Sequence, residues 1–213
     1  MAQRRKGEKE MTEMTKTQAK TRAMFSTKQM VMLALLSALA YVLMLIPIPF
    51  KFLGFLELEF SDVPAIVATL IYGPLAGVVV EFIKNFIKAI TATTTGGVGE
   101  LANFAIISGF IVPLGLLFRK LKNKYKTVIS FSSAIVGFMI AGILVNYFVT
   151  VPLYATLFGG MDVVVGAAAA TMPAIKDLAT IVILGITPFN FVKGIVISVT
   201  GYFVYKAFHK VIE

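Results

Sequence analysis

Four polar side chains, Asn103, Asn146, Asn190 and Lys193, lie inside or at the ends of long apolar runs of this chain. A polar group in hydrocarbon is costly without a partner, and such residues in membrane helices usually face a partner, a cavity or a pathway. Amides carry donors and an acceptor, and an ammonium carries three donors. Gathered at one depth, these groups suit a flat heterocycle with alternating N–H and C=O groups. The alternative is that each asparagine only hydrogen-bonds between helices, which is worth about 0.6–2 kcal/mol.

The elements that position these residues are expected to be membrane-spanning helices. Of the 213 residues, 58% are hydrophobic and 15% are charged. A soluble domain is about half apolar and about a quarter charged. Several apolar runs approach the roughly 20 residues that cross a bilayer, and they do not alternate as barrel strands do. The composition predicts an all-α, polytopic integral membrane protein of the cell membrane.

Several kinds of chemistry are excluded or disfavoured by residue type. The chain has no cysteine, so it has no disulfide, thiolate metal site or cysteine nucleophile. The single histidine, His209, lies in the basic C-terminus, where metal binding or catalysis is not expected. No segment matches the phosphate-binding pattern GxxxxGK[ST]. We therefore expect no metal site and no cofactor, and we do not expect the protein to be an enzyme.

The basic residues fall into three short segments. Residues 1–28 hold eight Lys/Arg, residues 119–126 hold five more, and Lys206 and Lys210 lie near the end of the chain. Cytoplasmic flanks of membrane helices carry such an excess of positive charge. Residues 1–27 are expected to be a disordered, basic cytoplasmic tail, and residues 28–213 a transmembrane domain.

The number of spans depends on one ambiguous stretch. Clear spans are 29–46, 100–118, 128–149 and 188–208. The stretch 63–90 could cross once, or twice with a break at Gly73-Pro74, since proline ends the helical hydrogen-bond ladder. Five spans would put 119–126 and the C-terminus opposite the basic N-terminus, whereas six spans put all three basic segments inside. We predict six spans with both termini cytoplasmic and a short second helix at about 61–72.

The outer loops are then 47–60, 91–99 and 150–187. The last loop is expected to hold a short surface helix from Ala167 to Leu184, because Lys176 and Asp177 argue against a buried span. Loop 47–60 is too apolar to face water simply. It either lies in the membrane interface or folds over an apolar ligand, and its four phenylalanines could stack on a ring: Phe50, Phe52, Phe55 and Phe60.

A second polar group lies on the expected third helix. Glu81, Lys84 and Asn85 share a face by their i,i+3 and i,i+4 spacing, and Lys88 extends it. We expect an internal ion pair that braces the site, because buried charge needs a partner. The glycine-rich loop 91–99 is either an ordinary turn or a place of close backbone approach.

Small residues on the first helix indicate a close helix contact. Ala34 and Ala38 are four residues apart, with Ser37 beside them. This spacing allows another helix to approach closely, either within the chain or from a separate subunit.

Four segments resemble the riboflavin-specific S component of energy-coupling factor (ECF) transporters. They are KFLGFLELEFSDVPA (51–65), EFIKNFIKAITATTTGGVGELANF (81–104), NYFVTVPLY (146–154) and TPFNFVKG (187–194). GGVGELANF and TPFN-x-x-KG are the specific motifs, and the resemblance covers about 28–208. Ala34 and Ala38 also match the wider S-component pattern.

The resemblance implies a six-helix membrane subunit that binds riboflavin with high affinity from outside, as a transported ligand and not as a cofactor. It implies docking through Ala34 and Ala38 onto a coupling transmembrane subunit joined to two ABC-type ATPases, and toppling of the whole subunit in the membrane. Loop 47–60 would be the gate. The implied ligand-site residues are Asn146, Asn190, Lys193, Glu100 and Asn103. To these the chemistry of the vitamin adds Glu57, for ribityl hydroxyls, and Phe60, for the ring.

Other functions remain open at this point. An S component for biotin or thiamin is the nearest alternative. A membrane enzyme acting on lipid would need a pair of acidic residues to bind a metal ion. Glu57 with Glu59 is the only close acidic pair in the outer loops. A structural subunit without ligand would not gather polar residues at one depth.

Overall fold

The computed structural model describes residues 24–46, 48–49, 51–53 and 56–212. Residues 33–213 form one compact unit, and the contacts described below lie inside it. The expected disordered tail, apart from residues 24–27, and both Phe50 and Phe55 lie outside the described residues.

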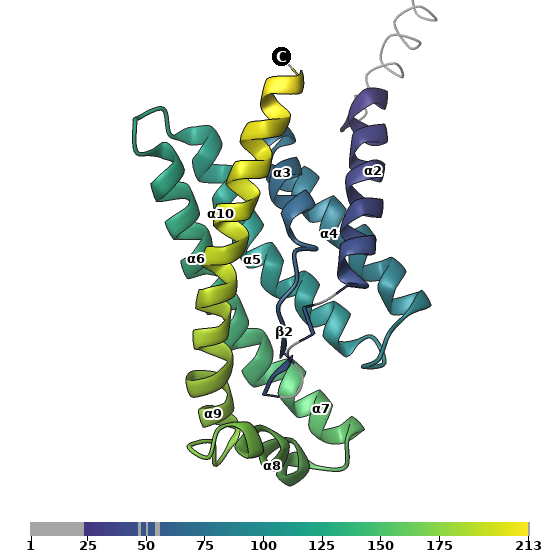
Figure 1. The fold of residues 1–213 in the computed structure, drawn as a ribbon, viewed down its shortest axis with the longest axis vertical. Helices are drawn as coiled ribbons and strands as arrows, with labels where there is room; N and C mark the ends of the chain where they lie inside the picture. Colours follow the sequence, from purple (N-terminus) through teal and green to yellow (C-terminus); the bar gives the residue numbers. More distant parts are fainter. Residues whose placement is uncertain (1–23, 47, 50, 54–55, 213) are drawn as a thin grey trace, which may run out of the picture. The chain divides into compact units, whose positions relative to one another are not determined.

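The described residues are mostly helical (Figure 1). The α-helices are α2 (Thr27–Met44), α3 (Val63–Tyr72), α4 (Pro74–Thr91), α5 (Val98–Lys120), α6 (Lys126–Val145), α7 (Val151–Leu157), α8 (Met161–Thr171), α9 (Leu178–Thr180) and α10 (Thr187–Ile212). Two wider π-helical turns, η1 (Asn146–Thr150) and η2 (Ile181–Ile186), join α6 to α7 and α9 to α10. The expected membrane-helical fold is confirmed.

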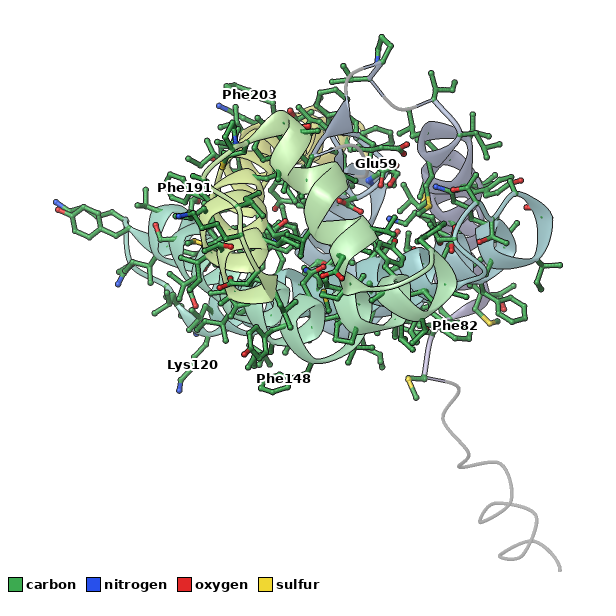
Figure 2. The ribbon with its side chains drawn as sticks, turned by 90° about the horizontal axis from the view of Figure 1, so that it is seen from below. Glu59, Phe82, Lys120, Phe148, Phe191 and Phe203 are labelled. Atoms are coloured by element: carbon green, nitrogen blue, oxygen red, sulfur yellow. The ribbon has the colours of Figure 1, made fainter. Side chains whose placement is uncertain are left out.

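Four continuous helices of the described chain are long and apolar enough to cross a membrane: Thr27–Met44, Val98–Lys120, Lys126–Leu157 and Leu178–Phe208. Large apolar side chains on them point outward. Phe148, Phe191 and Phe203 are 69%, 46% and 65% exposed, and they lie at the periphery when the molecule is seen along the bundle (Figure 2). Because such faces are unfavourable in water, they are suited to contact with lipid.

The predicted break between the second and third helices is present. Gly73 separates α3 from α4 with φ +100°, a conformation that favours glycine, and Pro74 follows at the start of α4. The Arg119 guanidinium packs so close to Gly73 that it would clash with a Cβ there. Helix α3 covers ten residues, close to the predicted second helix.

Helices α5 and α6 cross in close contact because glycines meet at the crossing. A Cβ on Gly137 would clash with the Gly109 carbonyl oxygen, and one on Gly109 would clash with the Ala141 methyl. The two backbones therefore approach as only small residues allow. This contact holds α5, which carries Asn103, beside α6, which leads directly into η1 at Asn146 (Figure 1).

The prediction of a surface helix from Ala167 to Leu184 is wrong. Helix α8 ends at Thr171, just before Pro173, and a new helix starts after Asp177. Asp177 caps it: its Oδ1 accepts from the Thr180 backbone N–H at 2.8 Å, and Thr180 Oγ1 accepts from the Asp177 N–H at 2.9 Å. The same Thr180 backbone and hydroxyl donors hold the pKa of Asp177 below its usual value.

Two spans are longer than predicted because the helix continues past a proline. The fifth continues to Leu157 and the last starts at Leu178, whereas the predicted limits were 149 and 188. Each extension passes a proline, Pro152 or Pro188, that lacks a backbone donor. The turns η1 and η2 precede these prolines, and such wide turns accommodate a proline without ending the helix.

The segment before α3 carries polar residues into the bundle. Strands β1 (Lys51–Phe52) and β2 (Leu56–Glu57) pair antiparallel, with Phe52 opposite Leu56. From β2 the chain runs to the start of α3 in the interior (Figure 1). Glu59 and Asp62 on this segment are 6% and 0% exposed.

A buried ion cluster joins this segment to α4 and α10. Asp62 lies between two lysines: its Oδ1 is 2.6 Å from Lys84 Nζ and its Oδ2 is 3.0 Å from Lys193 Nζ. Lys84 Nζ also lies 2.6 Å from Glu81 Oε2, and Lys193 Nζ lies 3.8 Å from Glu59 Oε1. The predicted internal Glu81–Lys84 pair is confirmed as part of this larger cluster.

Replacing Asp62 by alanine should destabilise the protein strongly. Two buried ammonium groups would lose their shared carboxylate, and breaking a buried ion pair from one side costs about 3–5 kcal/mol. We expect a clearly lower thermal unfolding midpoint in detergent. Asp162→Ala is the matched control, because Asp162 is exposed in the first turn of α8 and its removal should cost less than about 1 kcal/mol. Equal shifts in the two variants would contradict the structural role of the cluster.

The α5–α6 crossing predicts a second stability difference. Gly137→Val should force the two backbones apart and lower stability by about 1–3 kcal/mol, as overpacking does. Gly166→Ala on α8 is the control, because a Cβ there meets nothing within 4 Å. Unfolding curves of both variants check this, and a Gly137→Val midpoint at or above that of Gly166→Ala would argue against the close crossing.

Candidate functional site

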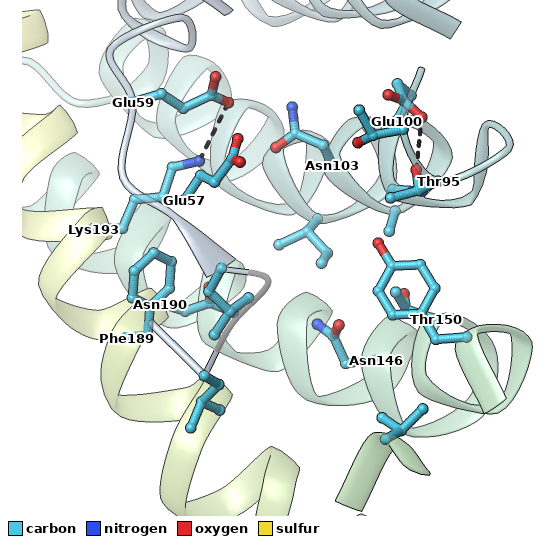
Figure 3. A pocket seen from close by; sticks show the side chains of 18 of the residues that line it. Glu57, Glu59, Thr95, Glu100, Asn103, Asn146, Thr150, Phe189, Asn190 and Lys193 are labelled. Atoms are coloured by element: carbon cyan, nitrogen blue, oxygen red, sulfur yellow. Dashed lines mark hydrogen bonds and ion pairs between the residues drawn. The ribbon is translucent and has the colours of Figure 1, made fainter. Parts of the chain in front are cut away.

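A cavity of about 590 Å³ lies at the end of the bundle that carries α7 and α8 (Figure 3). Its walls come from α4, α5, α6 with η1 and α7, α8, α10 and the β1–β2 segment. Ligand sites for small molecules usually measure about 300–1,000 Å³ and are mostly apolar with a few convergent polar groups. This cavity has that character, and the polar groups come from separate helices.

The structure brings together most of the residues singled out from the sequence. Six of the predicted ligand contacts line the cavity: Asn103, Asn146, Asn190, Lys193, Glu57 and Glu100. Lys88, which was expected to extend the charged face of the third helix, lines it as well. Phe60 is not among the lining residues and is 37% exposed. The convergence of the four membrane-embedded polar side chains on one cavity is therefore a property of the fold, and their role as ligand contacts stays a prediction.

Asn146 and Asn190 both lie beside Gly142 of α6. Asn146 begins η1, and its Nδ2 donates to the Gly142 carbonyl at 2.8 Å. Asn190 lies against Gly142, so that a Cβ on Gly142 would clash with the Asn190 Nδ2 atom. Among the described residues, Asn190 Nδ2 has no hydrogen-bond partner, although the side chain is only 5% exposed. An unpaired buried donor in a cavity wall is suited to a ligand acceptor.

Lys193 and Glu59 form the second polar wall. Lys193 is one turn after Asn190 on α10, and its ion pairs with Asp62 and Glu59 hold the ammonium at the cavity edge. Glu59 Oε2 has no hydrogen-bond partner in the described part of the chain. Glu59 was considered above only as half of an acidic pair. In an extended segment, residues two positions apart share a face. This spacing would have grouped Glu59 with Glu57 as a candidate for the cavity wall.

The glycine-rich loop shapes a third, hydroxyl-bearing part of the wall. Glu100 Oε2 accepts from Thr93 Oγ1 at 3.0 Å and from Thr95 Oγ1 at 3.1 Å. The loop turns through Gly96 and Gly97, whose φ angles are +63° and +89°, so its glycines serve a tight turn. The turn places Thr95 and Glu100 together on the cavity, as Figure 3 shows.

The apolar part of the wall involves residues not singled out from the sequence. On α6, directly after α7, on α8 and on α10, these include Phe138, Phe158, Val163, Val164, Ala167 and Phe189. Phe189 precedes Asn190, and Phe52 stacks on it with ring centroids 5.9 Å apart. Leu53 and Leu56 of the β1–β2 segment also line the cavity. Helix α8 contributes because it folds back over the cavity, which the residue pattern did not reveal.

The β1–β2 segment is anchored through Leu53. This leucine has φ +55°, is fully buried, and packs into a notch at Gly185, where a Cβ would clash with it. A left-handed backbone at a leucine is unfavourable and persists only when packing enforces it. We expected loop 47–60 either to lie in the membrane interface or to fold over a ligand. Its described part lies over the cavity.

The residues present suit an organic ligand. No group of three His, Asp or Glu side chains in the described ranges could hold a metal ion. The cavity instead offers amides, the ammonium groups of Lys88 and Lys193, carboxylates and threonine hydroxyls beside apolar walls. These groups can bind a flat, polar-edged ring with hydroxyl substituents by hydrogen bonds and stacking.

Comparison with known proteins places the chain in a family. Residues 28–205 match the family described as ECF transporter, substrate-specific component. The riboflavin transporter FmnP of Bacillus subtilis (strain 168) is 40% identical over 177 residues, which cover 81% of this chain and 87% of that protein. The riboflavin transporter RibU of Staphylococcus aureus (strain TCH60) is 35% identical over 191 residues, covering 86% and 91%.

A solved structure agrees with these sequence matches. The S component of a bacterial ECF transporter superposes with a TM-score of 0.70 at 29% identity, covering 87% of this chain and 98% of that one. The apolar helices, the cavity with its convergent polar groups and the extent of both matches lead to one assignment. The chain belongs to the family of substrate-specific components, or S components, of ECF transporters.

Proposed function

We propose that the chain binds riboflavin in the described cavity and mediates its uptake across the cell membrane. The observation that carries the proposal is the convergence of Asn146, Asn190 and Lys193 on one cavity, with Asn190 Nδ2 unpartnered among the described residues. Two relatives that match most of the chain are named riboflavin transporters. The relatives are transporters and not enzymes, which is consistent with a binding role.

The cavity chemistry supports this ligand group by group. Riboflavin has a polar pyrimidine edge, an apolar dimethylbenzene end and a polyol tail. Asn146, Asn190 and Lys193 serve the pyrimidine edge with donors and acceptors. Glu57 and Glu100 accept from the ribityl hydroxyls. Leu53, Leu56 and Phe189 pack on the ring faces, where stacking adds to apolar burial.

The arrangement of the helices supports six crossings with both termini cytoplasmic. The basic loop 121–125 and the α10 end lie at one end of the bundle, and α7 and α8 lie at the other (Figure 1). Helix α3 alone covers only about 15 Å at 1.5 Å per residue. The extended residues 56–60 before it add about 16 Å at 3.3 Å per residue, so together they match a hydrocarbon core of about 30 Å. The cavity then opens to the outside.

Energy for uptake is proposed to come from separate subunits. The sequence contains no GxxxxGK[ST] segment for nucleotide. Helix α2 presents an exposed apolar face that includes Ala34, Leu35, Ala38 and Leu39. The small residues allow a helix of another subunit to approach closely. We assign this face to the coupling transmembrane subunit, which is joined to two ABC-type ATPases.

Substitutions at the pyrimidine edge test the ligand site. Asn190→Ala and Lys193→Ala should each weaken riboflavin binding at least tenfold, or more than about 1.4 kcal/mol, because the ligand would lose a buried hydrogen bond. Quenching of riboflavin fluorescence measures the affinity. Val192→Ala is the control, since Val192 is 55% exposed beside Lys193. Wild-type affinity in a folded Asn190→Ala/Lys193→Ala double variant would remove these residues from the site.

Substitution on α2 separates binding from transport. Ala38→Leu should leave riboflavin affinity unchanged, because Ala38 does not line the cavity, and should abolish uptake by cells that supply the partner subunits. Ala207→Leu places the same side chain on an exposed position of α10 and should transport normally. Normal uptake by Ala38→Leu would show that α2 does not dock through this face.

A further inference from the structure

A chain of buried polar contacts runs behind the cavity and joins two residues of its wall. It leads from Lys193 to Asp62, on to Lys84 and Glu81, then to Asn85 and finally to Asn103. Lys193 and Asn103 line the cavity, whereas the four residues between them do not. The four are at most 4% exposed, so their polar groups depend on one another for hydrogen bonds.

Asn85 fixes the direction of the hydrogen bonds at the α5 end of this chain. Its Nδ2 donates to the Glu81 backbone carbonyl at 2.9 Å and to Glu81 Oε2 at 3.2 Å. An amide side chain alone can be turned either way, but a backbone carbonyl can only accept. The NH2 group of Asn85 must therefore face Glu81, and Asn85 Oδ1 is left to accept from the next residue.

The polarity of Asn103 follows from that of Asn85. Asn103 Nδ2 donates to Asn85 Oδ1 at 3.1 Å, on the side away from the cavity. Asn103 Oδ1 accepts no hydrogen bond from the described residues, and Figure 3 shows this oxygen on the side of Glu57. Turning the Asn103 amide would set its oxygen against the Asn85 oxygen, leaving two buried acceptors without a donor.

We infer that Asn85, which does not touch the ligand, is a positioning residue that presents Asn103 Oδ1 to the cavity as a hydrogen-bond acceptor. The inference rests on the proposed function, since the ligand is taken to be riboflavin. The α5 wall then demands an N–H or O–H donor from the ligand. The α10 wall offers the opposite, because Asn190 Nδ2 and Lys193 Nζ are donors. A ligand of reversed polarity would leave these groups unpaired and be rejected.

A double-mutant cycle tests the inference. The variants are Asn85→Leu, Asn103→Leu and the two combined, each titrated with riboflavin in detergent. Asn85→Leu alone should weaken binding at least fivefold, and in the Asn103→Leu background it should change the affinity less than twofold. This non-additivity is expected because Asn85 acts only through Asn103. Phe86→Leu is the control, because Phe86 is the next residue on α4 and is 55% exposed.

Two outcomes of the cycle would overturn the inference. One is an equal loss from Asn85→Leu in both backgrounds, which would mean a general structural role. The other is no loss from Asn85→Leu in the wild-type background. A folded wild-type protein that binds no riboflavin would instead contradict the proposed function and the inference with it.

A second comparison applies if Asn85→Leu does not fold. The loss caused by Asn103→Leu is measured for riboflavin, for 3-methylriboflavin, which lacks the ring N–H, and for lumiflavin, which lacks the ribityl hydroxyls. If Asn103 Oδ1 accepts from the ligand, the loss should disappear for one of the two analogues. The same loss with all three ligands would overturn the inference.

Discussion

The position of Asp62 between Lys84 and Lys193 is the constraint on which the site depends. Burial of two ammonium groups is unfavourable without a carboxylate between them. Asp62 can occupy this position only because α3 starts inside the bundle, after a segment that enters from the β1–β2 ladder. The ion cluster thus sets where α3 begins, how α10 is turned, and where the Lys193 ammonium lies.

Close helix contacts and wide helical turns complete the cavity. Glycines at the α5–α6 crossing and at Gly142 let backbones and amides approach where larger residues would clash. The turns η1 and η2 carry the helices past Pro152 and Pro188. Helix α8 and Leu53 close the apolar side of the cavity. The polar residues are therefore arranged by packing from several directions, which is the preorganisation that selective binding requires.

Much of this arrangement could be predicted from residue types. Polar groups in apolar runs identified Asn103, Asn146, Asn190 and Lys193 as wall residues, and helical spacing identified the Glu81–Lys84 pair. The partner of Lys84 and Lys193 could not be predicted, because Asp62 meets them only through tertiary packing. The limits of the last two spans were missed since a proline in sequence usually ends a helix, whereas π turns let these helices continue. Phe60 was grouped with the ring-stacking residues by type alone, and it is not among the residues that line the cavity.

The most direct test of the account is a titration of ligand-free, purified wild-type protein in detergent against riboflavin fluorescence, with thiamin and biotin as competitors. The account predicts saturable quenching at one site per chain that neither competitor reduces, because their groups do not match the amide and ammonium wall. Absence of quenching from a folded, monodisperse sample, or displacement of riboflavin by thiamin or biotin, would contradict it.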